Sequence, residues 1–128
     1  MPDVYHKSGV LFNEIKPGGF RILSAIYRVA SSLGFDLVIT SGCDGEHSGP
    51  DDPHHRGEAY DIRSHDFEQD EKDKILAAII TTLGPAFYAF LESPGTDNEH
   101  FHIQVRKGTT YPDPTGSNTS GTGGNAQI

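Results

Sequence analysis

The chain has 128 residues, which is enough for one domain with its own hydrophobic core. Its formal net charge of −8 argues against nucleic acid as a partner, because phosphate binding requires a surplus of Lys and Arg. No stretch approaches the about 20 apolar residues that a membrane span needs, so no membrane partner is expected. The single cysteine cannot form an internal disulfide, and we expect a monomer.

The first half of the chain shows one helical and one strand pattern. Residues 1–19 look irregular, and the apolar positions from Phe20 to Leu33 then follow helical spacing, with Gly34 as the stop. The β-branched, apolar run 35–40 predicts a buried strand. A segment rich in Gly, Asp, Ser and Pro follows at 41–53, and a loop of this length is often functional.

The next two elements are a strand and a helix. Residues 57–63 alternate, with Tyr60 and Ile62 on the apolar side and Asp61 on the other side, as in a strand with one buried face. Residues 66–83 begin with acids and continue with apolar residues at helical spacing, which predicts an amphipathic helix.

Two further strands complete the expected fold. Residues 86–91 and 100–106 have strand character, and the turn 93–98 joins them. The order of elements predicts an α+β domain with a small, mostly antiparallel sheet and helices packed on one face. We expect this domain to span residues 1–108 and to be followed by a flexible tail, residues 109–128, that is rich in Gly, Ser and Thr.

Histidine is the residue type whose distribution is informative. Six of the seven histidines fall into two short windows, 47–65 and 100–102, and both windows also carry carboxylates. A single histidine is usually a surface or core residue, but clustering in two windows indicates a metal site if the windows converge. His55 and His65 are expected to be solvated.

Three residues form the expected ligand set. Asp61 and His102 each lie on a strand and face away from its apolar side, where ligands on one sheet face would meet. His54 precedes Asp61 by seven residues and can fold back over the strand, since Gly57 permits a close turn. Two nitrogens and one oxygen suit zinc better than calcium or magnesium.

The second window adds an acid beside a histidine pair. Glu99 stands three residues before His102, and we expect it to take the proton of a metal-activated water as general base. The alternative for Glu99 is an ordinary acid in a turn.

These two windows resemble the zinc D-Ala-D-Ala metallopeptidases, whose group includes the lysostaphin-type peptidases and the hedgehog signalling domain. The family pattern is His-x-x-Gly-x-Ala-x-Asp, followed by acid-x-x-His or His-x-His. Over residues 20–106 it is matched by His54, Gly57, Ala59, Asp61, Glu99, His100 and His102. Compact single-domain members from phages and prophages are the most similar in pattern.

The resemblance implies a hedgehog/D-Ala-D-Ala peptidase-like fold and a Zn²⁺ peptidase. Such an enzyme hydrolyses peptide bonds in peptidoglycan stem peptides by attack of a zinc-bound water, as a carboxypeptidase or an endopeptidase. The implied ligands are His54, Asp61 and His102, with Glu99 as general base and His100 as a catalytic group that polarises the tetrahedral intermediate. The alternative is a catalytically inactive, zinc-containing binding module of the hedgehog type.

Substrate binding is the part that the motifs leave unassigned. Many members of the family carry an arginine directly after the Ser-Gly pair, where this chain has Cys43 and Asp44. Arg56 and Arg63 are the alternatives for holding a substrate carboxylate or oxyanion. The N-terminal residues lack a secretory signal pattern, so the expectation is cytoplasmic accumulation with phage-mediated release to the cell wall.

Overall fold

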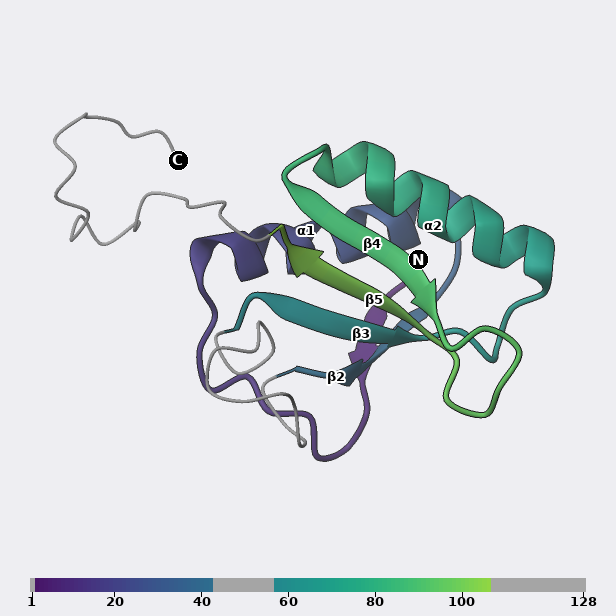
Figure 1. The fold of residues 1–128 in the computed structure, drawn as a ribbon, viewed down its shortest axis with the longest axis horizontal. Coiled ribbons are helices and arrows are strands. Elements are labelled where there is room, and N and C mark those ends of the chain that lie inside the picture. Colours follow the sequence, from purple (N-terminus) through teal and green to yellow (C-terminus); the bar gives the residue numbers. More distant parts are fainter. Residues whose placement is uncertain (1, 43–56, 107–128) are drawn as a thin grey trace, which may run out of the picture.

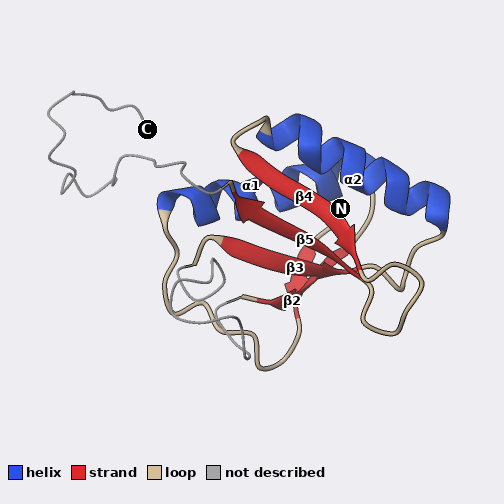
Figure 2. Ribbon diagram, viewed as in Figure 1, coloured by secondary structure: helices blue, strands red, loops and turns tan. Residues whose placement is uncertain are grey.

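One five-stranded sheet and two helices make up the part of the chain that the computed structural model describes, residues 2–42 and 57–106 (Figures 1 and 2). The fold is α+β, as predicted, and the sheet is mixed. The elements in chain order are β1 (Val4–His6), α1 (Pro17–Leu33), β2 (Leu37–Ser41), β3 (Ala59–Arg63), α2 (Gln69–Leu83), β4 (Phe87–Glu92) and β5 (His100–Val105).

The strand order β1-β2-β3-β5-β4 places the two strands from the predicted site windows side by side. Only β1 and β2 pair in parallel among the described strands, and the other neighbours are antiparallel. In the β3–β5 pair, Asp61 lies opposite His102 and Ile62 opposite Phe101. The register therefore brings Asp61 and His102, which are 41 positions apart in the chain, onto one sheet face.

The helices begin at other residues than the sequence predicts. Helix α1 begins at Pro17, three residues early, because proline has no N–H to leave unsatisfied in the first turn. It ends at Leu33, and the N–H of the following Gly34 donates to the Ala30 carbonyl at 2.9 Å. Helix α2 begins three residues late, because the Glu71 carboxylate accepts the Glu68 N–H at 2.8 Å and caps the first turn. Neither helix is long and apolar enough to cross a membrane.

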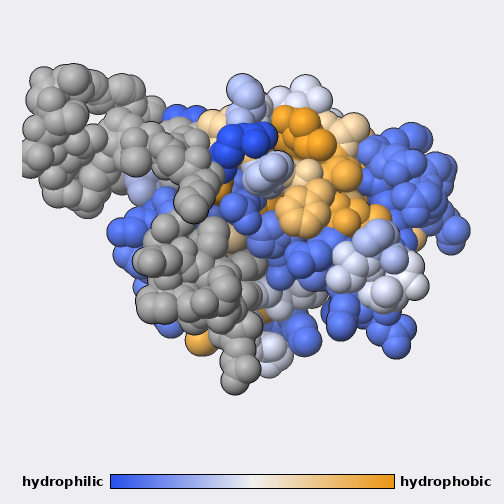
Figure 3. All heavy atoms as spheres, in the orientation of Figure 1, coloured by the Kyte–Doolittle hydropathy of each residue, from blue (hydrophilic) through white to orange (hydrophobic). Residues whose placement is uncertain are grey.

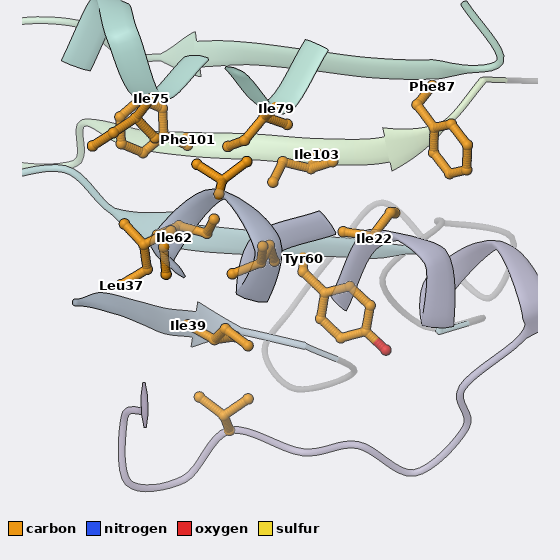
Figure 4. Close-up of a cluster of buried hydrophobic side chains, with 14 of the residues drawn as sticks. Ile22, Leu37, Ile39, Tyr60, Ile62, Ile75, Ile79, Phe87, Phe101 and Ile103 are labelled. Carbon is orange, nitrogen blue, oxygen red and sulfur yellow. The ribbon is translucent and has the colours of Figure 1, made fainter. Parts of the chain in front are cut away.

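The hydrophobic core lies between the helices and one face of the sheet (Figure 4). The inward positions that alternation predicts on β3 and β5 are confirmed, since four side chains there are fully buried: Tyr60, Ile62, Phe101 and Ile103. Helices α1 and α2 contribute the facing side chains, with Ile22, Ile26, Ile75 and Ile79 fully buried. The other sheet face is left to polar and aromatic residues, and this face carries the candidate site.

Strand β1 is a difference from the sequence prediction, which treated residues 1–19 as irregular. It has three residues, and its pairing with β2 is extended by Lys7, whose N–H donates to the Ile39 carbonyl at 2.8 Å. Two of its three residues are exposed, so no apolar alternation marks it in the sequence. Long-range pairing, and not local pattern, makes this segment a strand.

Candidate metal centre

Three potential metal ligands meet on the sheet face that the helices leave uncovered. Asp61 of β3 and His100 and His102 of β5 place one ligand atom each within 4.8 Å of one another. The β3–β5 register sets Asp61 directly opposite His102, and strand alternation puts His100 on the same face. The structure thus brings two of the three predicted ligands together, with His100 as the third member of the group.

The distances within this group suit a tetrahedral metal. The Asp61 Oδ1 atom lies 2.9 Å from His102 Nδ1, and Asp61 Oδ2 lies 3.6 Å from His100 Nε2. Ligand bonds of about 2.0 to 2.1 Å at tetrahedral angles separate neighbouring ligand atoms by about 3.4 Å. These two distances involve different oxygens of Asp61, and the single ligand atoms of the three residues lie within 4.8 Å of one another, so the side chains would close in by up to about 1.4 Å around one metal ion.

A backbone carbonyl fixes the tautomer of His100. Its Nδ1 lies 2.6 Å from the Asn98 carbonyl oxygen, which can only accept, so Nδ1 carries the hydrogen. In the neutral ring, Nε2 then directs a lone pair toward the carboxylates of Asp61 and Glu92, at 3.6 and 3.1 Å. A lone pair that faces two carboxylates leaves a position between them where a metal ion can bind.

His102 is hydrogen-bonded through both ring nitrogens. Its Nδ1 donates to Asp61 at 2.9 Å, and its Nε2 donates to the Gln104 side-chain oxygen at 2.8 Å. Burial lowers the pKa of His102, but the hydrogen bonds to Asp61 and Gln104 outweigh it and raise the pKa above the usual 6.5. With the pKa raised, a proton competes with a metal ion for the ring nitrogens of His102.

Glu92 is a functional candidate that the sequence analysis missed. It ends β4 opposite His100, and its Oε1 lies 3.1 Å from His100 Nε2 and 3.8 Å from His102 Nδ1. Its side chain is 46% exposed, so water reaches it. The turn 93–98 could have indicated Glu92 from the sequence, since closing that turn pairs the end of β4 with the start of β5.

Glu99, the predicted general base, lies elsewhere. Its side chain is 5% exposed and accepts three bonds: from Lys72 Nζ at 2.6 Å, Ser64 Oγ at 2.6 Å and the Gly95 N–H at 3.0 Å. The hydrogen bonds from Lys72, Ser64 and Gly95 outweigh burial and lower the pKa of Glu99 from 4.5 to about 2. The structure does not bring Glu99 to the group of Asp61, His100 and His102.

The physical reason is strand alternation. Glu99 directly precedes β5, and its carboxylate meets Lys72 of α2, so it lies on the helix side together with Phe101. His100 and His102 point to the opposite face. A residue three positions before His102 therefore lies on the opposite face of the sheet from His102. The acid-x-x-His motif does not by itself place the acid beside the metal.

Of the two predicted substrate-binding arginines, the described chain places Arg63 near the site. Arg63 lies opposite His100 at the end of β3, on the face that carries Asp61, and its side chain is 41% exposed. Its guanidinium lies 3.9 Å from Asp66, a distance that leaves only a loose ion pair. Arg56 and the predicted ligand His54 lie outside the described residues, as does the expected tail 109–128.

Gly57 has to be glycine because two backbone segments meet there. Its φ is +71°, and a Cβ would lie 1.7 Å from the Glu14 carbonyl oxygen. The Lys16 N–H donates to the Gly57 carbonyl, and a Cβ on Gly19 would meet the same oxygen at 1.8 Å. The segment before α1 is therefore packed directly against Gly57, which stands two residues before Ala59, the first residue of β3.

Comparison of the chain with protein-family models, curated proteins and solved structures found no match. The geometry and chemistry of the site therefore carry the functional argument.

Proposed function

We propose that this protein is a zinc-dependent hydrolase of the peptidase type, centred on Asp61, His100 and His102. The observation that carries the proposal is the convergence of three ligand atoms within 4.8 Å on the sheet face opposite helices α1 and α2. One carboxylate oxygen and two imidazole nitrogens form a donor set that zinc accepts readily. The peptidoglycan stem peptide as substrate is supported by the resemblance of residues 54–61 and 99–102 to the D-Ala-D-Ala metallopeptidases.

The chemistry divides between the ion and the chain. A bound zinc supplies Lewis acidity, which activates water and polarises a carbonyl group. Glu92 is the carboxylate placed to accept a proton, because it lies 3.1 Å from His100 and is open to solvent. Arg63 lies one strand over from His100 and offers a cation to a substrate carboxylate or a developing oxyanion.

Replacing Glu92 tests the assignment of the base. We expect Glu92→Gln to keep its zinc and its fold while the rate of hydrolysis falls about 10²- to 10⁴-fold, the usual cost of losing a positioned base. The measurement combines metal analysis with mass spectrometry of new amines released from muropeptides and D-Ala-D-Ala peptides. Asp70→Asn, an exposed acid on α2, is the matched control.

Two outcomes would contradict this assignment. Full activity in Glu92→Gln, together with loss of activity but not stability in Glu99→Gln, would return the base role to Glu99. Failure of the wild-type protein to retain zinc after metal-replete expression would remove the hydrolase proposal, since such sites bind tightly.

A zinc-containing binding module is the second candidate. It is favoured if His100, which lies in the metal group, is a ligand in addition to the three predicted ones. A catalytic zinc has three protein ligands and an open position, whereas four protein ligands close the site. If His54 joins Asp61, His100 and His102, the site is closed and structural. Zinc content of His54→Ala and His100→Ala decides: loss in both variants indicates four ligands and a module, and loss in one indicates an open site.

A further inference from the structure

Aromatic residues continue the site face beyond the metal ligands. On β4, Phe90 lies opposite His102 and Tyr88 lies opposite Gln104, so both side chains are on the face of the metal group. The Phe90 and His102 ring centroids are 5.3 Å apart, and those of Phe90 and Tyr88 are 6.3 Å apart. Both aromatic side chains stay open to solvent, at 40% and 48% exposed. Figure 3 shows apolar side chains gathered over β4 next to hydrophilic side chains over β3 and β5.

An arginine is fixed at the far end of this row. The Arg106 Nε donates to the Pro85 carbonyl at 2.9 Å, and the guanidinium carbon lies 4.2 Å from the centre of the Tyr88 ring. These two contacts orient the guanidinium before any ligand arrives, so a ligand that binds it costs less conformational entropy. Its two terminal NH₂ groups form a planar fork that matches a carboxylate.

Charge separates the two ends of the face. At the metal end, the carboxylates of Asp61 and Glu92 stand beside the cation of Arg63, and the chain as a whole carries a net charge of −8. At the other end of β5, the exposed Arg106 adds a second positive charge to this face. An anionic group of a substrate is therefore favoured at Arg106 and an uncharged peptide segment over the rings of Phe90 and Tyr88.

Building on the proposed hydrolase, we infer that Tyr88, Phe90 and Arg106 form a subsite for a peptide whose carboxylate lies three or four residues from the bond that is cut. Arg106 follows His102 by four residues and stands one residue beyond the end of β5, and at about 3.3 Å per residue of extended chain these cover about 13 Å. An extended peptide spans the same distance with about four residues. A carboxypeptidase places the terminal carboxylate one residue from the cut, so this spacing favours an endopeptidase.

Peptide binding by calorimetry tests the subsite. The probes are N-acetylated pentaalanine with a free C-terminal carboxylate, the same peptide as its amide, and an amide that ends in glutamate instead of alanine. We expect the wild-type protein to bind one or both carboxylate peptides about tenfold more tightly than the plain amide, the usual scale for one charge-assisted hydrogen-bonded pair. Comparison of the two carboxylate peptides shows whether the bound carboxylate is the C-terminal one or that of a glutamate side chain.

Variants assign the preference to its residues. Arg106→Met should abolish the difference between carboxylate and amide, and Arg106→Lys should retain part of it because lysine keeps the charge without the fork. Tyr88→Ala should weaken all three peptides by about threefold and should also reduce the difference between carboxylate and amide, since the Tyr88 ring helps to orient the Arg106 guanidinium. The control Arg28→Met removes an exposed arginine on the helix side and should behave as wild type.

The subsite and the hydrolase can fail separately. Because none of the three subsite residues is a proposed ligand, the carboxylate preference should be present in both zinc-free and zinc-loaded protein. Equal binding of acid and amide by the wild type, or a preference that survives Arg106→Met, would overturn the subsite even if zinc and hydrolysis are found. Where hydrolysis occurs, products cut at the terminal residue would overturn the spacing, and products cut three or four residues from the carboxylate support it.

Discussion

Glu99 and His100 are neighbours in the chain, but their side chains belong to opposite faces of the sheet and to different chemistry. On the helix side, Glu99 is buried and bound to Lys72, Ser64 and the Gly95 N–H. On the open side, His100 faces Asp61 and Glu92 across distances that a metal ion or a proton can fill. The comparison shows that fixed donors and burial hold the Glu99 carboxylate in place, whereas the Glu92 carboxylate beside the histidines stays 46% exposed.

The largest expected effect concerns the open face. Replacing His102 by alanine removes a proposed ligand, so zinc affinity should fall by more than the about 10- to 100-fold that is typical for changes outside the ligand sphere, and hydrolysis should cease. The stability of the metal-free protein should fall by about 1 to 3 kcal/mol, because the His102 and Asp61 side chains are only 11% and 13% exposed and the change leaves the Asp61 carboxylate without this hydrogen bond. Metal analysis after dialysis and chemical denaturation measure the two effects.

The control for this variant is His65→Ala, which removes an exposed histidine outside the metal group. It should keep both zinc and stability. A His102→Ala protein that bound zinc as tightly as wild type would contradict the assignment of His102 as a ligand. The proposed difference in metal binding between the two faces would then be wrong.

The helix side should respond in stability and not in metal binding. Lys72→Met leaves the Glu99 carboxylate buried without its cation, and we expect the free energy of unfolding to fall by about 3 kcal/mol. Zinc content measured at a temperature where the variant is folded should remain that of wild type. Equilibrium denaturation in urea gives the stability.

A double-mutant cycle with Glu99→Gln sharpens this prediction. The double variant should lose less stability than the sum of the two single variants, because each single change already breaks the same ion pair. Additive losses would contradict the pairing, and loss of zinc from Glu99→Gln in folded protein would mean that the open face depends on Glu99 directly.

The smallest effect is a pH dependence of opposite sign on the two faces. The pKa of Glu99 is lowered from 4.5 to about 2, so its contribution is present above about pH 4.5 and is lost as the pH falls toward 2. The pKa of His102 is raised, so its contribution is present below 6.5 and is lost as the pH rises through the folded value. Unfolding of metal-free wild type, Glu99→Gln and His102→Ala between pH 2 and 9 checks both directions, and parallel curves for all three would contradict them.

Much of the fold was predictable because its elements repeat a local pattern. The alternation of residues 57–63 and 100–106 placed Tyr60 and Ile62 in the core, and helical spacing found α1. Strand β1 was not predictable, since a three-residue strand with two exposed members depends on pairing with β2. Helix boundaries differed by three residues because Pro17 and the Glu71 cap act locally on the first turn.

The candidate site was predictable to the extent that it follows from strand faces. Asp61 and His102 were placed by alternation, and the same rule, applied one residue earlier, would have placed Glu99 on the helix side. Glu92 required the register of the β4–β5 pair, which the turn suggests but does not fix. Lys72 could not be found at all, because its contact with Glu99 joins residues 27 positions apart from different elements.

The parallel pairing of β1 with β2 has a consequence for the order of folding. Strands β4 and β5 are joined by a short turn, so they can meet at little cost in chain entropy, whereas the segment that contains α1 separates β1 from β2. We expect the hairpin that carries His102 to assemble early and the N-terminal strand to dock last. The amides of β1 should then exchange with solvent through local opening long before those of β5, so that the N-terminal edge opens while the hairpin stays closed.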